Sequence, residues 1–408
     1  MHCTKCPAGR RTFTLFLSGM KISSNIILPV FAAVGLVAGG LYSVIHQKQS
    51  QSNPPTAQQE QAATELRTDA FSLRIFQQML DDKSGNVMVA PLAISQTLLK
   101  LETIAAGKTL EQLQALQLDK TRYKRDTGTD HASLVTIDMN VPRKQQATQV
   151  LALPFSEDVP LALSIFNGAL AQRMNRDNAQ YATSDMVNER TRLLAGTVAA
   201  AHCKFETPFL SVHTRTADFD SASGAMPHYR QMRNRAGYRT AKAADGSWHA
   251  VALPFASRSN GKAPLVFIGI LPSGSARDFA KDLTPEQLTD IRKALAEAAP
   301  QDTLVELPRL DFVVQPYDMR YILRRLGLVS LFDSETADFS PLTEQKIHLG
   351  AMVYAAEASI QDTPTNQAAA QDLDYAKNYI SFSRPFLWMI TDLSTGSPLD
   401  FIGIVEEM

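Results

Sequence analysis

The first candidate for chemistry in this chain is the adjacent pair His202 and Cys203. A histidine that takes the proton of a cysteine thiol creates a nucleophile, as in cysteine hydrolases. Successive side chains of a strand point to opposite faces, however, so neighbours in an extended segment do not form such a pair. We therefore interpret Cys203 as a small buried residue.

Two carboxylates, Asp372 and Asp374, share a face if their segment is extended, and paired carboxylates can perform acid–base chemistry. They lie among small and polar residues with no pattern of a pocket, which favours solvated or recognition charges. His2, Cys3 and Cys6 have ligand-like spacing, but no second pair completes a tetrahedral zinc site. The sequence also lacks a Gly-x-Ser-x-Gly elbow and a Gly-rich phosphate loop. We expect no catalytic residue, no metal and no cofactor.

The segment that contains these two carboxylates, residues 362–379 (DTPTNQAAAQDLDYAKNY), is the most informative part of the chain. Apolar runs that predict strands flank it, Ile347–Glu357 before it and Phe382–Ile390 and Leu399–Val405 after it. A loop of this length without structure of its own is usually functional. The pattern predicts an exposed segment held by sheet at both ends.

The rest of the chain predicts helices and strands in mixed order. Thr284, Pro285 and Gln287 form a capping box that predicts a helix over 284–298, and Gly327 is suited to end a helix over 317–326. Further helices are predicted over 71–80 and 94–104, and strands over 251–255, 265–271, 304–307 and 310–314. Strands in hairpin-like pairs, without regular alternation with helices, favour an α+β domain with antiparallel sheets.

The order and spacing of several motifs resemble the serpin family over roughly residues 64–408. The carboxy-terminal motifs are LPRLDF, YDMRYILRRLGLVSLF, ADFSPL, the hinge-like run 357–370, FSRPFLWMI and FIGIV. The amino-terminal motifs, similar to the opening helices of that family, are FSLRIFQQML, NVMVAPLAISQTLLKL and GKTLEQLQAL. The resemblance implies an α+β, serpin-like fold of mixed, mostly antiparallel sheets, with a helical amino-terminal body and an exposed reactive loop.

The resemblance also implies a function for the loop. A serine or cysteine protease attacks one loop bond and forms an acyl-enzyme, and the freed loop then enters the main sheet as an added strand and distorts the protease. The alternative is a non-inhibitory serpin-fold module that binds a partner or is cleaved like a substrate. In both cases the protein acts through its loop and is not an enzyme.

The resemblance places the hinge of this loop at Asp362, Thr363, Pro364, Thr365, Ala368, Ala369 and Ala370. Relatives usually have Gly-Thr-Glu followed by alanines, so Thr363 matches and Pro364 departs from the pattern. A proline in a central strand loses one ladder hydrogen bond and costs roughly 1 to 3 kcal/mol. A new strand with about a dozen hydrogen bonds of ~1 kcal/mol each remains favourable. The same cost placed on the barrier slows insertion roughly ten- to a hundredfold.

Family spacing brackets the attacked bond. Counting forward from Thr363 places it just after Ala376, and counting back from Pro385 places it nearer Asp374. The candidates are Asp374, Tyr375, Ala376, Lys377 and Asn378. Lys377 suits a trypsin-like protease, Tyr375 a chymotrypsin-like one and Asp374 an acid-preferring one.

A second departure from the family lies under the predicted sheet opening. Relatives have a hydrogen-bonded cluster of two serines, an asparagine and a histidine there, and the matching positions here are Ala90, Ala93, Thr197 and Met352. Replacing nearly all members of a polar cluster by apolar residues can be almost neutral. The sequence therefore predicts a coherent repacking.

The composition is that of a globular body, with 408 residues of which 45% are hydrophobic and 20% charged. The net charge of -1 argues against nucleic acid as a partner. Cys203 is the one cysteine of the body, so no disulfide is expected within it. The expected partner is a serine or cysteine protease, and we expect a monomer.

The amino terminus predicts export. A basic segment (1–25), an uncharged apolar run (26–45) and a Gln-rich linker (46–63) precede the serpin-like body (64–408). The apolar run is either a signal peptide with small residues at Ala38-Gly39-Gly40 or a transmembrane anchor that tethers the protein. A buried helix of the fold is a third interpretation. The first two place the body in an extracellular or periplasmic location.

Overall fold

The computed structural model describes residues 57–118, 120, 129–144, 149–256, 265–365, 373, 375–393 and 398–408. Contacts divide the chain into two units, residues 1–60 and 61–408, and the second contains the fold discussed below. The basic segment, the apolar run and the linker up to residue 56 lie outside the described ranges, as do His2, Cys3 and Cys6. Among the helices described, none is both long and apolar enough to cross a bilayer.

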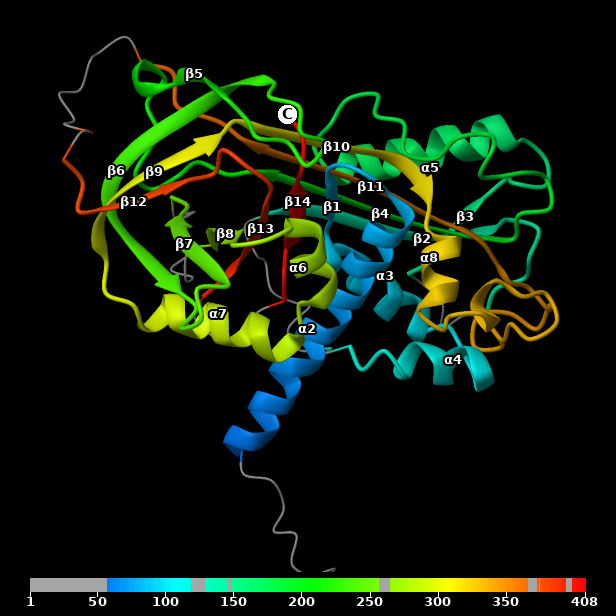
Figure 1. The fold of residues 1–408 in the computed structure, drawn as a ribbon. Coiled ribbons are helices and arrows are strands. Elements are labelled where there is room, and N and C mark those ends of the chain that lie inside the picture. Colours follow the sequence, from blue (N-terminus) through cyan, green and yellow to red (C-terminus); the bar gives the residue numbers. More distant parts are fainter. Residues whose placement is uncertain are drawn as a thin grey trace, which may run out of the picture. The chain divides into compact units, whose positions relative to one another are not determined.

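Figure 1 shows the helices of the described chain. They are α2 (Ala57–Asp82), α3 (Pro91–Glu102), α4 (Gly107–Gln114), α5 (Val159–Arg173), α6 (Ala276–Asp282), α7 (Pro285–Glu297) and α8 (Arg320–Arg325), with short 3₁₀ turns η2 (Ser211–His213) and η3 (Ser330–Phe332). The predicted capping box of α7 is confirmed, because the Thr284 hydroxyl accepts the Gln287 N–H and the Gln287 side chain accepts the Thr284 N–H. Gly327 has the expected positive φ of 98°.

The first sheet has five strands in the order β10 (Leu310–Asp318), β11 (Leu349–Ile360), β4 (Leu193–His202), β2 (Asp130–Asp138) and β3 (Leu151–Leu153). The pairs β11–β4 and β2–β3 are parallel, and the other two are antiparallel. The prediction that a helix starts at Tyr317 was wrong, because β10 continues to Asp318 and pairs with β11 up to that residue. Sheet pairing here overrides the local helical pattern by three residues.

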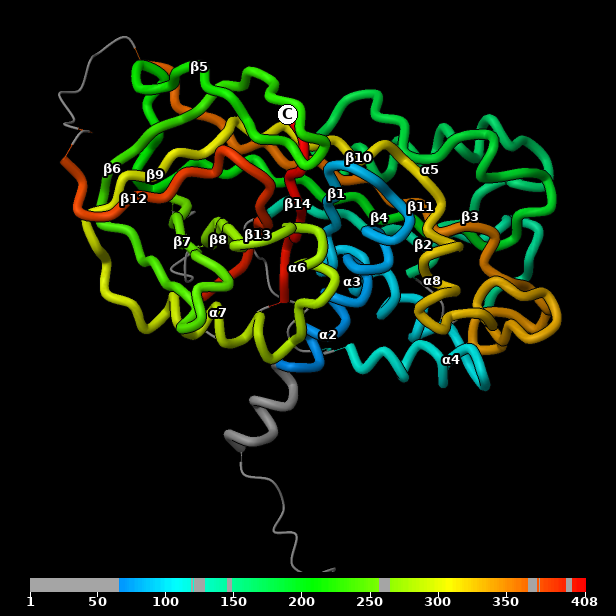
Figure 2. Tube along the Cα trace, viewed as in Figure 1, coloured from blue at the N-terminus to red at the C-terminus, as the bar shows by residue number. Residues whose placement is uncertain are grey.

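The second sheet follows the order β1 (Val87–Val89), β14 (Phe401–Val405), β13 (Phe386–Asp392), β8 (Leu265–Pro272), β7 (Trp248–Pro254), β6 (His228–Lys242), β9 (Gln301–Pro308) and β12 (Asn378–Ser381), with β5 (Arg215–Asp218) also paired to β6. The pair β12–β9 is parallel, and the rest are antiparallel. Figure 2 shows β12 and β9 side by side along the edge of this sheet. The predicted strand from Phe382 begins only at Phe386, since Pro385 has no N–H to donate to a ladder.

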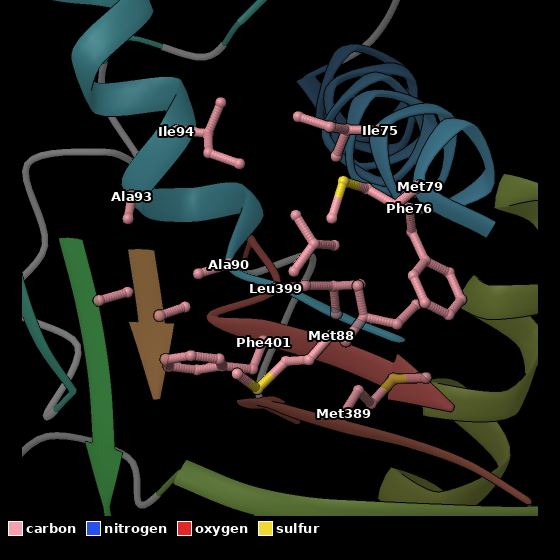
Figure 3. Close-up of a cluster of buried hydrophobic side chains, with 14 of the residues drawn as sticks. Ile75, Phe76, Met79, Met88, Ala90, Ala93, Ile94, Met389, Leu399 and Phe401 are labelled. Carbon is pink, nitrogen blue, oxygen red and sulfur yellow. The ribbon is translucent and has the colours of Figure 1, made fainter. Parts of the chain in front are cut away.

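Two hydrophobic cores hold the elements together. The larger one lies between the sheets and the amino-terminal helices, and Figure 3 shows side chains of α2, α3, β1, β13 and β14 that meet in it. Trp388 is fully buried there and stacks on Phe267 and Phe312, with ring centroids 6.1 and 5.3 Å away. The smaller core lies between α5 and one face of the five-stranded sheet. Gly196 of β4 makes the close approach of α5 possible, because a Cβ atom there would lie 2.5 Å from the Phe166 ring.

Candidate functional site

The segment predicted to be the loop leaves the five-stranded sheet after β11, where Asp362 anchors its first residues. The Asp362 side chain is only 5% exposed, and both its carboxylate oxygens accept hydrogen bonds from Nη2 of Arg309, at 2.8 and 2.7 Å. The Thr214 hydroxyl donates a further, short hydrogen bond to the same carboxylate. Nε of Arg309 donates a third hydrogen bond at 3.2 Å, and a charge-assisted pair of this kind with low exposure is a strong local constraint. The start of the hinge is therefore fixed to residues of other elements.

The next hinge residues are held through their backbone. The Thr363 N–H donates to the Phe209 carbonyl at 2.7 Å, and the Ser211 N–H donates to the Thr363 carbonyl at 3.0 Å. The Thr365 N–H donates to the Ser211 hydroxyl at 3.0 Å. Pro364 lies between them with an exposed side chain. Ala368, Ala369 and Ala370 lie outside the residues that the structure describes.

The predicted attack site lies at the far end of the loop. Tyr375 is 79% exposed, Lys377 is also exposed and Ala376 is half-buried, whereas Asp374 is beyond the described ranges. Asn378 is already the first residue of β12, and its side-chain amide donates to the Gln301 side chain at 3.0 Å. The loop is thus shorter than the predicted 362–379, because β12 pairs with β9 from Asn378 onward.

Electrostatic contacts fix the strand that follows the attack site. The buried Glu306 carboxylate accepts hydrogen bonds from the Tyr379 hydroxyl at 2.6 Å and the Ser381 hydroxyl at 3.0 Å. It also pairs with Arg215 and Arg233 at 2.9 and 3.0 Å. Burial raises the pKa of Tyr379, and the hydrogen bond to Glu306 raises it further. The two ends of the loop are therefore bound to two different sheets.

The strands beside the hinge could accept a new strand. β11 and β4 are parallel neighbours, in continuous register from Ala351 opposite Leu194 to Ser359 opposite His202, after an irregularity between Leu349 and Ala351. A segment that turned back after Asp362 would run antiparallel to both strands. One parallel pair would become two antiparallel pairs, which are slightly more stable per residue. We call the boundary between β4 and β11 the seam.

The repacking predicted beneath the seam includes a residue that the sequence analysis missed. The Thr197 hydroxyl donates to the Ala93 carbonyl at 3.0 Å, and the fully buried Tyr354 hydroxyl accepts the Ala90 N–H at 2.8 Å. Figure 3 shows Ala90 and Ala93 at the beginning of α3. Burial raises the pKa of Tyr354. The sequence offered one signal for this residue, because Tyr354 lies two positions after Met352 and therefore on the same face of the strand.

Of the first candidates for chemistry, the structure describes His202 and Cys203, whose side chains lie on opposite faces of the sheet. The His202 side chain contacts Glu357 on the α5 side of the sheet, whereas Cys203 packs against the larger core. Asp372 and Asp374 lie outside the described ranges. Within the part of the chain that the structure describes, no three His, Cys, Asp or Glu side chains form a group that could hold a metal ion.

Comparisons with known proteins agree with this arrangement. The family model "Serpin (serine protease inhibitor)" matches residues 141–408. Plasminogen activator inhibitor 1 of Mus musculus is 26% identical over 311 residues, which cover 68% of this chain and 74% of that protein. Plasminogen activator inhibitor 1 of Bos taurus is 24% identical over 421 residues and covers 93% and 99%.

Solved structures show the same fold. A crystal structure of maspin matches with a TM-score of 0.74 at 17% identity, covering 85% of this chain and 99% of that one. Uncleaved ovalbumin matches with a TM-score of 0.73 at 18% identity, covering 84% and 99%. The predicted α+β fold of mixed, mostly antiparallel sheets with a helical amino-terminal body is confirmed.

Proposed function

Because this chain belongs to the serpin family, we propose that it inhibits a protease by offering its exposed loop as a substrate. The protease serine or cysteine attacks a carbonyl carbon between Asp374 and Asn378, and the peptide C–N bond breaks as the acyl-enzyme forms. The hinge side of the loop, with the protease attached, then enters the seam. The inhibitor contributes the loop bond that is attacked and the sheet that accepts the loop. The protease contributes the catalytic groups.

The observation that supports this proposal is the attachment of the loop to two sheets. While the chain is intact, the segment between Thr365 and Asn378 is bound to β11 at one end and to β12 at the other. Full insertion beside β11 would require β12 to leave β9. Cleavage of a bond between Asp374 and Asn378 separates the hinge from β12. The segment on the hinge side of the cut can then enter the sheet while β12 stays paired with β9. This attachment therefore supports insertion after attack rather than before it.

The chemistry of the hinge supports a second candidate function, a serpin-fold module that is cleaved or bound without trapping a protease. Pro364 removes one donor from the strand that must form, and the Asp362–Arg309 pair must break before the hinge moves. Both slow insertion relative to hydrolysis of the acyl-enzyme. If hydrolysis is faster, the protease is released and the loop is simply cleaved.

Incubation with a panel of serine and cysteine proteases, followed by denaturing gel electrophoresis, separates these functions. A detergent-stable complex is the expected result for an inhibitor, and clean cleavage of the loop supports the second candidate. Mass spectrometry of the released carboxy-terminal peptide should show a new amino terminus between Tyr375 and Asn378. Cleavage confined to the linker 46–63 would contradict the role of the loop.

Two hinge variants test insertion itself. Pro364→Glu restores the missing N–H and the usual family residue, so we expect severalfold fewer inhibitor molecules consumed per protease trapped. Thr363→Arg places a charge on a face that must be buried and should leave a pure substrate. If both variants are cleaved like the parent, with no gain in melting temperature after cleavage, loop insertion is not part of the function.

We also propose that the body acts outside the cytoplasm, as a monomer, either released after cleavage of the run 26–45 or tethered through it. Both fates of this run carry the body across a membrane. A reporter that is active only in the cytoplasm, fused after Met408, should be inactive in cells. Full activity of that reporter would contradict export.

A further inference from the structure

In the half of the seam nearest the hinge, six of eight facing residues are alanine. The facing pairs there are Ala355–Val198, Ala356–Ala199, Glu357–Ala200 and Ala358–Ala201. Contacts between facing side chains are a main source of sheet stability, and alanine pairs contribute the least of it. The backbone hydrogen bonds of the parallel pair therefore provide most of the stability of this part of the seam. A polar contact across it contributes a larger share of that stability than it would in a well-packed sheet.

Three charged or polar side chains lie across this weakly packed region. Glu357 comes from β11, His202 from β4, and Arg176 from the turn that follows α5. The His202 Nε2 atom lies 2.8 Å from Glu357 Oε1 and 2.5 Å from Nη2 of Arg176. Arg176 forms a short ion pair with the same Glu357 oxygen. One carboxylate thus connects both strands of the seam and the end of the helix that covers it.

Insertion of a strand requires the contact that joins the two strands, between His202 and Glu357, to break. Neighbouring strands lie about 4.8 Å apart, so admitting one strand moves β4 and β11 to roughly twice that distance. The contact of His202 with Glu357 does not survive such a movement, and Arg176 can then contact only one of these two side chains. The side chains of α5 that pack on both strands, such as Phe166, must shift as well.

We propose that Arg176, His202 and Glu357 form an electrostatic clasp that sets how readily the seam opens. They are positioning residues for the inhibitory reaction, because none of them touches the attacked bond. The consequence for protease trapping rests on the proposed function, whereas the clasp itself can be measured without a protease. The side chains are 34 to 44% exposed, so the effect is that of a partly solvated ion pair, roughly three- to tenfold in the opening equilibrium.

Hydrogen exchange of the full chain, read by mass spectrometry, tests the clasp. Amide exchange in native protein reports local opening. In Glu357→Gln we expect segments 193–202 and 349–360 to exchange about three- to tenfold faster, with segments 265–272 and 386–392 of the other sheet unchanged. His202→Gln should give the same pattern and serves as the second variant.

Asp302→Asn is the matched control. Asp302 pairs with Arg235 at 2.7 Å with side chains 33% and 23% exposed, and this ion pair joins β9 and β6 of the other sheet. The Asp302→Asn variant should leave amide exchange in the strands of the seam unchanged. A general acceleration of both sheets in Glu357→Gln, or no acceleration at the seam in either clasp variant, overturns the proposal.

A second measurement links the clasp to insertion. A synthetic peptide with the sequence of residues 363–374 should enter the seam of Glu357→Gln about three- to tenfold faster than that of the parent, as followed by the rise in melting temperature. If the seam responds in both measurements but the parent traps no protease, the clasp stands and the proposed function fails. If the parent traps a protease and the seam responds in neither, the clasp alone is refuted.

Discussion

Replacing Asp362 by Asn should release the hinge. The carboxylate, with a side chain only 5% exposed, accepts three hydrogen bonds from Arg309, two from Nη2 and one from Nε, and one from Thr214. Hydrogen bonds to a charged group contribute about 1.5 to 3 kcal/mol, and the amide of Asn retains part of this. Arg309 is 35% exposed and regains hydration, which reduces the loss. We expect the native state to lose about 2 kcal/mol.

This loss of native-state stability should make insertion of the cleaved loop faster. If the Asp362–Arg309 pair breaks before the insertion barrier, the barrier falls by the same ~2 kcal/mol, which corresponds to roughly 30-fold in rate at 1.4 kcal/mol per decade. The assay cleaves the loop with a protease, follows insertion by intrinsic fluorescence and records melting before and after cleavage. The native form should melt about 2 to 4 °C lower. The cleaved form, in which the pair is already broken, should be unchanged.

Two further variants serve as comparisons, one that removes the partner of Asp362 and one that breaks an unrelated surface ion pair. Arg309→Gln should destabilise the native form more, because it leaves a buried carboxylate without its cation. Glu344→Gln breaks an ion pair with Lys144 in which the glutamate is 84% exposed, and should change neither quantity. If Asp362→Asn lowers native melting but leaves the insertion rate within twofold of the parent, the pair is not on the path of hinge release.

Three further outcomes are expected. Gly196→Ala should cost about 1 to 3 kcal/mol, because its Cβ meets the Phe166 ring of α5 at 2.5 Å, and denaturant unfolding checks it. Gly403→Ala places a Cβ 2.7 Å from the Trp388 ring and should shift tryptophan emission as well as lower stability by a similar amount. Burial is the main reason that the pKa of His249 is lowered from 6.5 to about 4. The unfolded chain therefore binds this proton more readily, and stability present above pH 6.5 is lost as the pH falls towards 4. The melting temperature of His249→Gln, measured against pH, should therefore fall less than that of the parent between pH 6.5 and about 4.

Local signals in the sequence determined many of the elements. The capping box at Thr284 and the left-handed position of Gly327 depend on neighbours within a few residues, so they could be predicted without a fold. The ordered motifs indicated the family and the α+β architecture. The same motifs indicated that the segment after Ile360 is the functional one, because a polar segment of small residues between two strand patterns cannot be core.

Only the tertiary structure decided which segments meet. Strand patterns do not specify partners, so the parallel pairing of β11 with β4, and of β12 with β9, came from packing between distant parts of the chain. Sheet pairing also moved the end of the loop to Asn378. The contacts of Asp362 with Arg309 and of Glu357 with His202 join residues 53 and 155 positions apart. No local periodicity encodes such contacts, because they exist only once the strands have found their register.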